Sequence, residues 1–279
     1  MLNRSAERIT AVAELMVPLC AKPPGFVKWK SYQYNEMRLM KLSLVIPAYN
    51  EAGRIEQSLE QVFDFLAGFS GSAEIIVVDD GSRDATPALV QAKAQGRPDL
   101  RLIRLPRNQG KGAAVRAGVL ESQGDWILMT DADLSTPLSE LPRFFAALAD
   151  GFDLAVGSRQ LPGARIGRRQ PWLRQSAGLL FGFILRRIVP VGVVDTQCGF
   201  KLFRGEPGRN LFRRLSVKGF CFDLELLALA RRAGLQITEI PVTWSNAEGS
   251  KVSLLWDLPG VIWEVLQIRW KLWRRTDRP

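Results

Sequence analysis

An apolar run that leads directly into two acidic residues lies near the middle of the chain: Trp126-Ile127-Leu128-Met129-Thr130-Asp131-Ala132-Asp133. A short run of large apolar residues is typical of a strand that is buried on both faces. Side chains two apart in an extended chain point the same way, so Asp131 and Asp133 would repel each other unless a cation lay between them. The stretch therefore predicts a buried strand that ends at a divalent metal site. A solvated acidic turn with capping aspartates would have the same sequence, so the motif alone does not decide.

Similar apolar runs occur on both sides of this strand and alternate with helical patterns. The expected strands are 42–46, 74–78, 100–105, 126–129 and 154–157, and the expected helices are 51–66, one that opens at Thr86 and Pro87, 112–123, and one from Thr136 to about Asp150. We expect Pro47 to end the first strand. Strands that alternate with helices predict an α/β fold with a doubly wound, mostly parallel sheet and helices on both faces.

Ligands of such sheets bind beyond the carboxyl ends of the strands. Polar residues follow several of the expected strands at this end. They are Tyr49, Asn50, Glu51, Asp79, Asp80, the segment 108–111, Asp131 and Asp133. We therefore expect these side chains to converge on one cleft.

Composition limits the chemistry of that cleft. The 279 residues are 47% hydrophobic, carry a formal charge of +10 and include no histidine. The charge favours an acidic partner, which could be a phosphorylated substrate, an anionic lipid or a nucleic acid. The missing histidine excludes a Ser-His-Asp triad and a histidine-ligated zinc or iron centre. Carboxylates remain, and they favour a hard cation such as Mg²⁺ or Mn²⁺.

Cysteine spacing and hydropathy indicate the compartment. Cys20, Cys198 and Cys221 are far apart and form no CxxC pair, which fits a reducing cytoplasmic environment. No apolar stretch reaches the roughly 20 residues needed to cross a bilayer. We expect a cytoplasmic protein that is peripheral on the membrane and does not span it.

A loop with a lysine precedes the helix expected at 112–123. It reads Arg107-Asn108-Gln109-Gly110-Lys111-Gly112 and lacks the GxxxxGK[ST] pattern of a Walker A loop. Free amides at a helix start and a cation suit a phosphate, although a solvated lysine in an ordinary first turn would look the same. Asp80, at the end of another strand, could accept bonds from a base or a ribose, as an acid does in dinucleotide folds.

Four motifs occur in a fixed order: 45–51 (VIPAYNE), 78–84 (VDDGSRD), 108–112 (NQGKG) and 131–133 (DAD). Together they resemble the donor half of the inverting glycosyltransferases with a GT-A fold, which bind nucleotide sugars. The segments 157–159, 195–203, 222–227 and 249–251, with Trp244, resemble the dolichyl-phosphate β-glucosyltransferases more narrowly. The resemblance runs from about Lys41 to the C-terminus.

That resemblance implies a UDP-glucose donor, a polyprenyl or dolichyl phosphate acceptor, a divalent metal (Mg²⁺ or Mn²⁺) and inversion at the anomeric carbon. The residues that it places around the nucleotide sugar are Pro47, Tyr49, Glu51, Asp80, Lys111 and Asp131, with Asp131 and Asp133 as the metal ligands. The chain departs from the family in two ways. We do not expect the N-terminal membrane helix of the eukaryotic enzyme in this sequence, and Ser135 stands where related mannosyl enzymes usually have glutamine, so a GDP-mannose donor stays open as an alternative.

The acceptor half contributes its own candidates. Asp195 would position the acceptor or act as a base, while Gln197 and Lys201 would bind the acceptor; a buried, purely structural Asp–Lys pair is the alternative. A phosphate acceptor is largely ionised at neutral pH, so positioning is the expected role of Asp195. The catalytic candidates are Asp133, Asp195, Arg159 and Arg174, of which the two arginines would hold the acceptor phosphate.

Basic and apolar residues mix in two segments. The stretch from Arg159 to Arg187 holds seven arginines and no acid, and Trp263, Leu266, Trp270 and Trp273 recur at helical spacing near the basic C-terminus. A solvated basic face is one interpretation, but the interleaved apolar residues favour contact with an anionic membrane surface. No nucleic-acid-binding signature accompanies the charge, so we expect no nucleic acid partner.

These features divide the chain into four parts: an N-terminal extension (1–40), a nucleotide-sugar-binding half (41–165), an acceptor-binding and membrane-facing half (166–254) and a C-terminal basic amphipathic helix (255–279). A processive polysaccharide synthase is disfavoured because 267–270 is one residue too short for QxxRW. A non-catalytic membrane-surface or nucleic-acid-binding α/β protein is the rival of another class, and it would leave the aligned acids unexplained.

Overall fold

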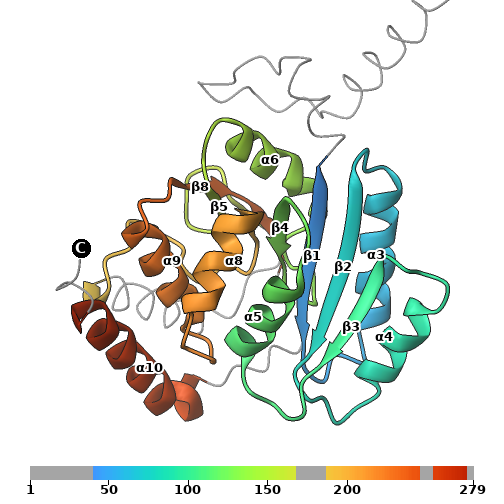
Figure 1. Cartoon of the computed structure of the whole chain (residues 1–279), viewed down its shortest axis with the longest axis horizontal. Helices are drawn as coiled ribbons and strands as arrows, with labels where there is room; N and C mark the ends of the chain where they lie inside the picture. The colour runs from blue at the N-terminus through green and yellow to red at the C-terminus, as the bar shows by residue number, and fades with distance from the viewer. Residues whose placement is uncertain (1–39, 168–186, 246–253, 275–279) are drawn as a thin grey trace, which may run out of the picture. The chain divides into compact units, whose positions relative to one another are not determined.

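The structure, a computed structural model, describes residues 40–167, 187–245 and 254–274. A seven-stranded sheet forms its centre, in the order β3-β2-β1-β4-β7-β5-β8 (Figure 1). The strands are β1 (Lys41–Ala48), β2 (Ser72–Asp79), β3 (Leu100–Arg104), β4 (Trp126–Met129), β5 (Leu154–Ser158), β7 (Lys201–Arg204) and β8 (Ile237–Pro241). A separate two-stranded ladder joins β6 (Arg165–Ile166) to β9 (Thr243–Trp244).

The sheet is parallel except at β7. β3, β2, β1 and β4 run parallel to one another, as do β5 and β8. β7 lies between β4 and β5 and is antiparallel to both. The mostly parallel sheet is thus confirmed, and β7 brings the start of its strand, Lys201, to the edge of the sheet where β4 and β5 end.

Helices cover both faces of the sheet, as expected. They are α3 (Ile55–Ala67), α4 (Thr86–Ala94), α5 (Lys111–Glu121), the 3-10 turn η1 (Leu138–Glu140), α6 (Leu141–Ala149), α8 (Gly205–Arg214), α9 (Phe222–Arg232) and α10 (Leu254–Arg274). Side chains of β1 alternate between two cores. Leu44 packs in one core with residues of α3 and α6, and Val45 packs in the other with residues of α5, α8 and α9.

Three expected boundaries were wrong. The helix expected from Thr136 begins only at Leu141, after the 3-10 turn η1, because Pro137 has an extended backbone. β1 does not end at Pro47 but continues to Ala48. Proline is tolerated at this position because β4 pairs with β1 only as far as Val45, so the sheet needs no hydrogen bond from the N–H that Pro47 lacks. The helix expected from Glu51 begins at Ile55. Asn50 has a left-handed φ of 53°, and the carbonyl of Glu51 accepts from the amides of Arg54 and Ile55, so a turn precedes the helix.

Several predictions concern segments outside the described residues. They include the extension up to residue 39 and most of the arginine-rich stretch, with Arg174. The division at residue 165 stays a prediction, but strands from both sides of it belong to one sheet. In the described parts of the chain, no helix combines the length and the hydropathy that crossing a bilayer requires.

Candidate active site

Asp131 and Lys111 meet beyond the carboxyl end of β4. Asp131 follows β4 after one residue, Thr130, and Lys111 is the first residue of α5, so two separate elements fix the pair. The Lys111 Nζ lies 2.5 Å from Asp131 Oδ1. Gly199 lies against the same carboxylate, since a Cβ on Gly199 would be 2.1 Å from Asp131 Oδ2. The structure therefore joins the loop lysine to the first acid of the DxD motif.

Charge compensation governs the protonation of this pair. Burial disfavours the charge on Lys111, but the carboxylates of Asp131 and Asp223 outweigh it and raise the pKa of the ammonium group. Burial likewise opposes ionisation of Asp131, but Lys111 lowers the pKa of that carboxyl. Both groups are therefore charged at neutral pH.

Asp195 and Arg159 form a second pair at the end of β5. The Arg159 Nε and Nη2 donate to the two oxygens of Asp195 at 2.7 and 2.8 Å, and the Arg159 amide donates to Oδ2 at 2.9 Å. Asp195 is 1% exposed. Burial opposes its ionisation, but the bonds and charge of Arg159 lower the pKa of the carboxyl. A carboxylate held in this way is a poor base, which agrees with a positioning role.

Lys201 and Asp223 form a third, fully buried pair. Lys201 opens β7, has no exposed surface, and donates from Nζ to Asp223 Oδ1 and to the Cys198 carbonyl, both at 2.5 Å. Burial raises the pKa of the Asp223 carboxyl even though Lys201 opposes the shift. Lys201 thus holds the chain just before Gly199, the residue against which Asp131 lies.

The three pairs form one charge cluster, in which Lys201, Asp223 and Asp195 are buried and Lys111, Asp131 and Arg159 are partly exposed. Asp131 interacts electrostatically with Lys111, Lys201 and Arg159, and Asp223 with both lysines. Three basic and three acidic side chains balance one another there: Lys111, Arg159, Lys201, Asp131, Asp195 and Asp223. Asp223 was not among the expected site residues. The sequence feature that could have indicated Asp223 is an acidic residue inside the apolar run 222–227, but only the fold shows that its partner is Lys201.

Asp133, the second DxD acid, lies at the rim of this cluster. Its Oδ1 accepts from the Ser135 amide at 2.9 Å, and its Oδ2 lies 4.0 Å from Arg54 Nη1. The side chain is 28% exposed, so it can meet a ligand from solvent. Among the described residues no three acidic or thiol side chains cluster as a metal cage. The donor set instead fits an ion that is bound by one or two carboxylates and by substrate phosphates.

The nucleotide candidates follow β1 and β2. Asp80 is almost fully buried, and its two oxygens accept from the amides of Gln109 and Gly110, both at 2.8 Å. Burial raises the pKa of this carboxyl. Asp80 therefore fixes the loop that precedes Lys111. Glu51 contacts Arg54 Nε at 2.8 Å, and Pro47 and Tyr49 lie partly buried on either side of the end of β1.

Three polar atoms near the second pair have no hydrogen-bond partner within the described structure. They are Ser158 Oγ, Thr196 Oγ1 and Gln197 Nε2, all buried. They flank Arg159 and Asp195 in sequence. Unpartnered buried polar atoms are costly, so a bound ligand or water that satisfies them would be stabilised. The expected position of Gln197 in the acceptor site is compatible with this observation.

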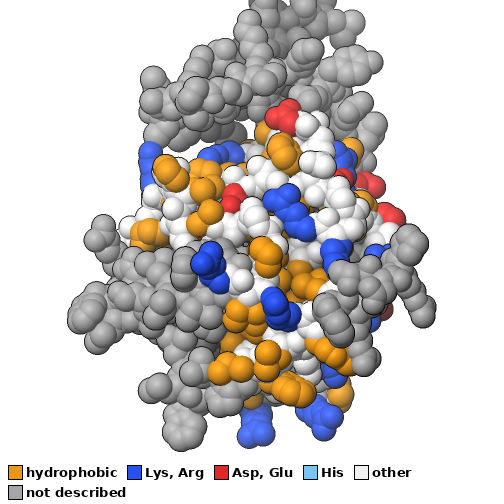
Figure 2. Space-filling view, turned by 90° about the vertical axis from the view of Figure 1, so that its left-hand side faces the viewer, with side chains coloured by type: hydrophobic (Ala, Val, Ile, Leu, Met, Phe, Trp, Pro, Cys, Tyr) orange, Lys and Arg blue, Asp and Glu red, His pale blue; other side chains and the backbone are white. Residues whose placement is uncertain are grey.

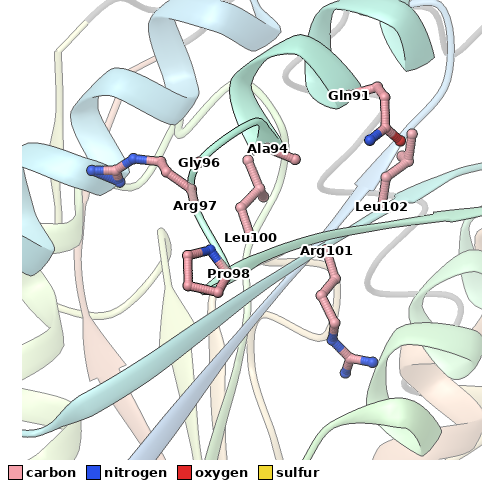
Figure 3. Close-up of a pocket in the computed structure, with 8 residues that line it drawn as sticks. All are labelled: Gln91, Ala94, Gly96, Arg97, Pro98, Leu100, Arg101 and Leu102. Carbon is pink, nitrogen blue, oxygen red and sulfur yellow. The ribbon is translucent and has the colours of Figure 1, made fainter.

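A groove of about 650 Å³ lies elsewhere, where α4 meets the start of β3 (Figure 3). Arg97 and Arg101 line it, but each already has partners. Arg97 stacks on Phe63 at 3.6 Å, and Arg101 donates to Glu74 and to the Glu121 carbonyl. The groove is at the amino end of β3, whereas the charge cluster follows carboxyl ends, so we assign it no part in the site.

The fold and the site define a glycosyltransferase of the GT-A class. A glucosyl-3-phosphoglycerate synthase of Mycobacterium tuberculosis, solved with Mn²⁺, UDP-glucose and phosphoglyceric acid, has a TM-score of 0.64 at 20% identity over 89% of this chain and 85% of that one. A Pyrobaculum calidifontis mannosyltransferase, solved with GDP-mannose and Mn²⁺, has a TM-score of 0.54 at 21% identity over 91% and 67%. At these identities the likeness establishes the fold.

Residues 43–212 match the model of glycosyl transferase family 2. The chain is 40% identical over 223 residues to a dolichyl-phosphate beta-glucosyltransferase of Trichomonas vaginalis, covering 76% of this chain and 66% of the relative. The Homo sapiens enzyme of that name is 36% identical over 230 residues, covering 77% and 71%. The chain belongs to glycosyl transferase family 2 and, within it, to the dolichyl-phosphate β-glucosyltransferase family. The expected family, fold and enzyme class are thus confirmed, and the non-catalytic rival is set aside.

Proposed function

We propose that the protein transfers glucose from UDP-glucose to a polyprenyl or dolichyl phosphate at the cytoplasmic face of a membrane. Its similarity to dolichyl-phosphate β-glucosyltransferases over about three quarters of the chain is the observation that carries the proposal. The balanced charge cluster beside an accessible acid supports it.

The reaction is a single displacement. An oxygen of the acceptor phosphate attacks the anomeric carbon of glucose, the bond from that carbon to the diphosphate oxygen breaks, and UDP leaves. The configuration at the anomeric carbon inverts. The acceptor phosphate is ionised at neutral pH, so the protein need not supply a strong base.

On the donor side, Pro47, Tyr49, Glu51 and Asp80 would frame the nucleotide. Asp133 fits a metal ligand because it is accessible and retains acceptor capacity, with Asp131 beside it. A bound Mg²⁺ or Mn²⁺ supplies neutralising charge for the leaving diphosphate. Lys111 is fixed by Asp131 and sits at the N-terminus of α5, where the helix dipole also favours negative charge.

On the acceptor side, Arg159 would hold the lipid phosphate together with Arg174, which lies outside the described residues. The Arg159 side chain is 29% exposed, and two of its five guanidinium N–H groups serve Asp195. Asp195 therefore orients a guanidinium that retains donors for a phosphate. Gln197 would contact the acceptor. Lys201, being fully buried, would act by fixing the segment 195–200.

Membrane association would involve α10. Its large apolar side chains Ile262, Trp263, Leu266 and Trp270 are exposed, with Trp263 at 64%. Figure 2 shows hydrophobic and Lys or Arg side chains together over the lower part of the face that carries α10. Such a mixture suits an anionic lipid surface.

A donor and acceptor panel tests the proposal. Purified protein with Mn²⁺ and polyprenyl phosphate would be given labelled UDP-glucose, UDP-galactose or GDP-mannose, and the lipid extract counted. Labelled lipid from UDP-glucose is expected. Labelled lipid from GDP-mannose instead would establish the alternative donor, and no labelled lipid from any donor would refute the proposed reaction.

A further inference from the structure

A strap of six residues, 216–221, joins α8 to α9 and is held by two carboxylates. Glu225 accepts from the amides of Ser216 and Val217 at 2.9 and 2.7 Å. Glu264 accepts from the amides of Gly219 and Cys221, both at 3.0 Å. Four backbone amides of the strap therefore depend on two acidic side chains, one of which belongs to the distant helix α10.

The other side of the strap packs on the first turn of α5. The Lys218 carbonyl accepts from the Ala113 amide at 3.1 Å. A Cβ on Gly110 would lie 2.5 Å from the Lys218 carbonyl oxygen, and one on Gly112 would lie 2.8 Å from that of Val217. Only glycine allows this approach. Gly110 and Gly112 flank Lys111, so the strap sets the place of the lysine that meets Asp131.

A second contact from α10 reinforces the first. The Lys271 Nζ donates to Glu225 Oε1, Ser216 Oγ and the Arg214 carbonyl at 2.5 to 2.9 Å. Burial opposes ionisation of Glu225, but Lys271 lowers the pKa of that carboxyl. α10 therefore carries one of the two carboxylates that hold the strap, Glu264, and its Lys271 forms an ion pair with the other, Glu225.

We propose that Glu264 is a positioning residue, which through the strap sets the first turn of α5 and so the donor-binding geometry of Lys111. The role in donor binding rests on the proposed function. The same helix exposes Trp263 and Leu266, so a membrane that engages α10 also engages the element that anchors the strap. The donor site and the membrane-facing helix are therefore mechanically linked.

Glu264→Gln is the direct test. The substitution replaces one of the two accepting oxygens by an NH₂ group, so one strap amide faces a donor where it now has an acceptor. We expect hydrogen exchange at amides 110–114 and 219–221 to accelerate by about tenfold, because the strap loosens locally. We expect the Kd for UDP-glucose with Mn²⁺, measured calorimetrically without lipid, to rise by about tenfold, while the KM for the lipid acceptor stays unchanged.

Glu206→Gln is the matched control, since Glu206 is an exposed acid on α8 that pairs with Arg209 and Arg213. It should change neither measurement. If Glu264→Gln fails to fold, Lys271→Met perturbs the same strap from its other end and should shift both readouts in the same direction. Wild-type exchange at 110–114 in the folded variant would overturn the coupling. If Glu264→Gln shows faster exchange but binds UDP-glucose as tightly as the wild type, the role of Glu264 in donor binding is overturned. If the wild type itself does not bind UDP-glucose, the proposed function is refuted, and the exchange rates alone then test the coupling between the strap and α5.

Discussion

Gly199→Ala tests whether the placement of Asp131 controls the reaction. The new Cβ would lie 2.1 Å from Asp131 Oδ2 and 2.5 Å from its Cγ, whereas ordinary contact begins at 3.4 Å. The carboxylate must therefore move by more than about 1 Å, so its 2.5 Å contact with Lys111 cannot keep its present geometry. A misplacement of about 1 Å can cost about 100-fold in rate. We expect kcat/KM for glucose transfer to fall by about that factor, or about 2.7 kcal/mol of transition-state stabilisation.

The fold should survive the substitution. Overpacking one methyl group costs about 1–3 kcal/mol, which a domain of ordinary stability survives. Initial rates over a range of UDP-glucose concentrations and thermal unfolding of the same samples separate the two effects. Gly68→Ala is the control, because its Cβ would meet only the Phe65 carbonyl oxygen, at 3.7 Å. A folded Gly199→Ala protein with kcat/KM within about threefold of wild type would refute the reasoning.

Three other predictions follow from the site and the surface. Asp133→Ala should remove metal-dependent transfer with little change in stability, as EDTA should for the wild type; full activity in EDTA would exclude the metal role. The lowered pKa of Asp195 stabilises the fold above its ordinary value of 3.8, and this stabilisation is lost as pH falls below that value toward the folded-state pKa. Denaturant titrations from pH 3 to 7 should therefore show a flatter pH dependence for Asp195→Asn, by up to about 1 kcal/mol over that range, and an equal slope would contradict this. Trp263→Ala with Leu266→Ala should weaken salt-sensitive flotation with anionic vesicles, and undiminished flotation would remove α10 from the membrane contact.

The donor half of the site was predictable because parallel strands end at one edge of a sheet. The apolar run 126–129 placed Asp131, and the loop before α5 placed Lys111, so their meeting needed only the strand order. β7 was not predicted, because four residues with a charge at each end carry no clear strand period.

The buried charges could not be read from the sequence. The sequence allows a buried pair between Lys201 and Asp195, but the partner of Lys201 is Asp223, 22 residues away, and only the fold brings these two together. The strap was hidden for the same reason, since its four amides are held by side chains from α9 and α10. Contacts between distant elements leave no local pattern.

The chemistry of the product tests the central claim most directly. Wild-type protein, UDP-glucose, Mn²⁺ and a short-chain polyprenyl phosphate would be incubated together, and the products examined by proton and phosphorus NMR. The account predicts a β-linked glucosyl phosphodiester of the lipid, formed together with one equivalent of UDP. An α-linked product, or release of UMP with a lipid diphosphate, would contradict a single displacement by the lipid phosphate.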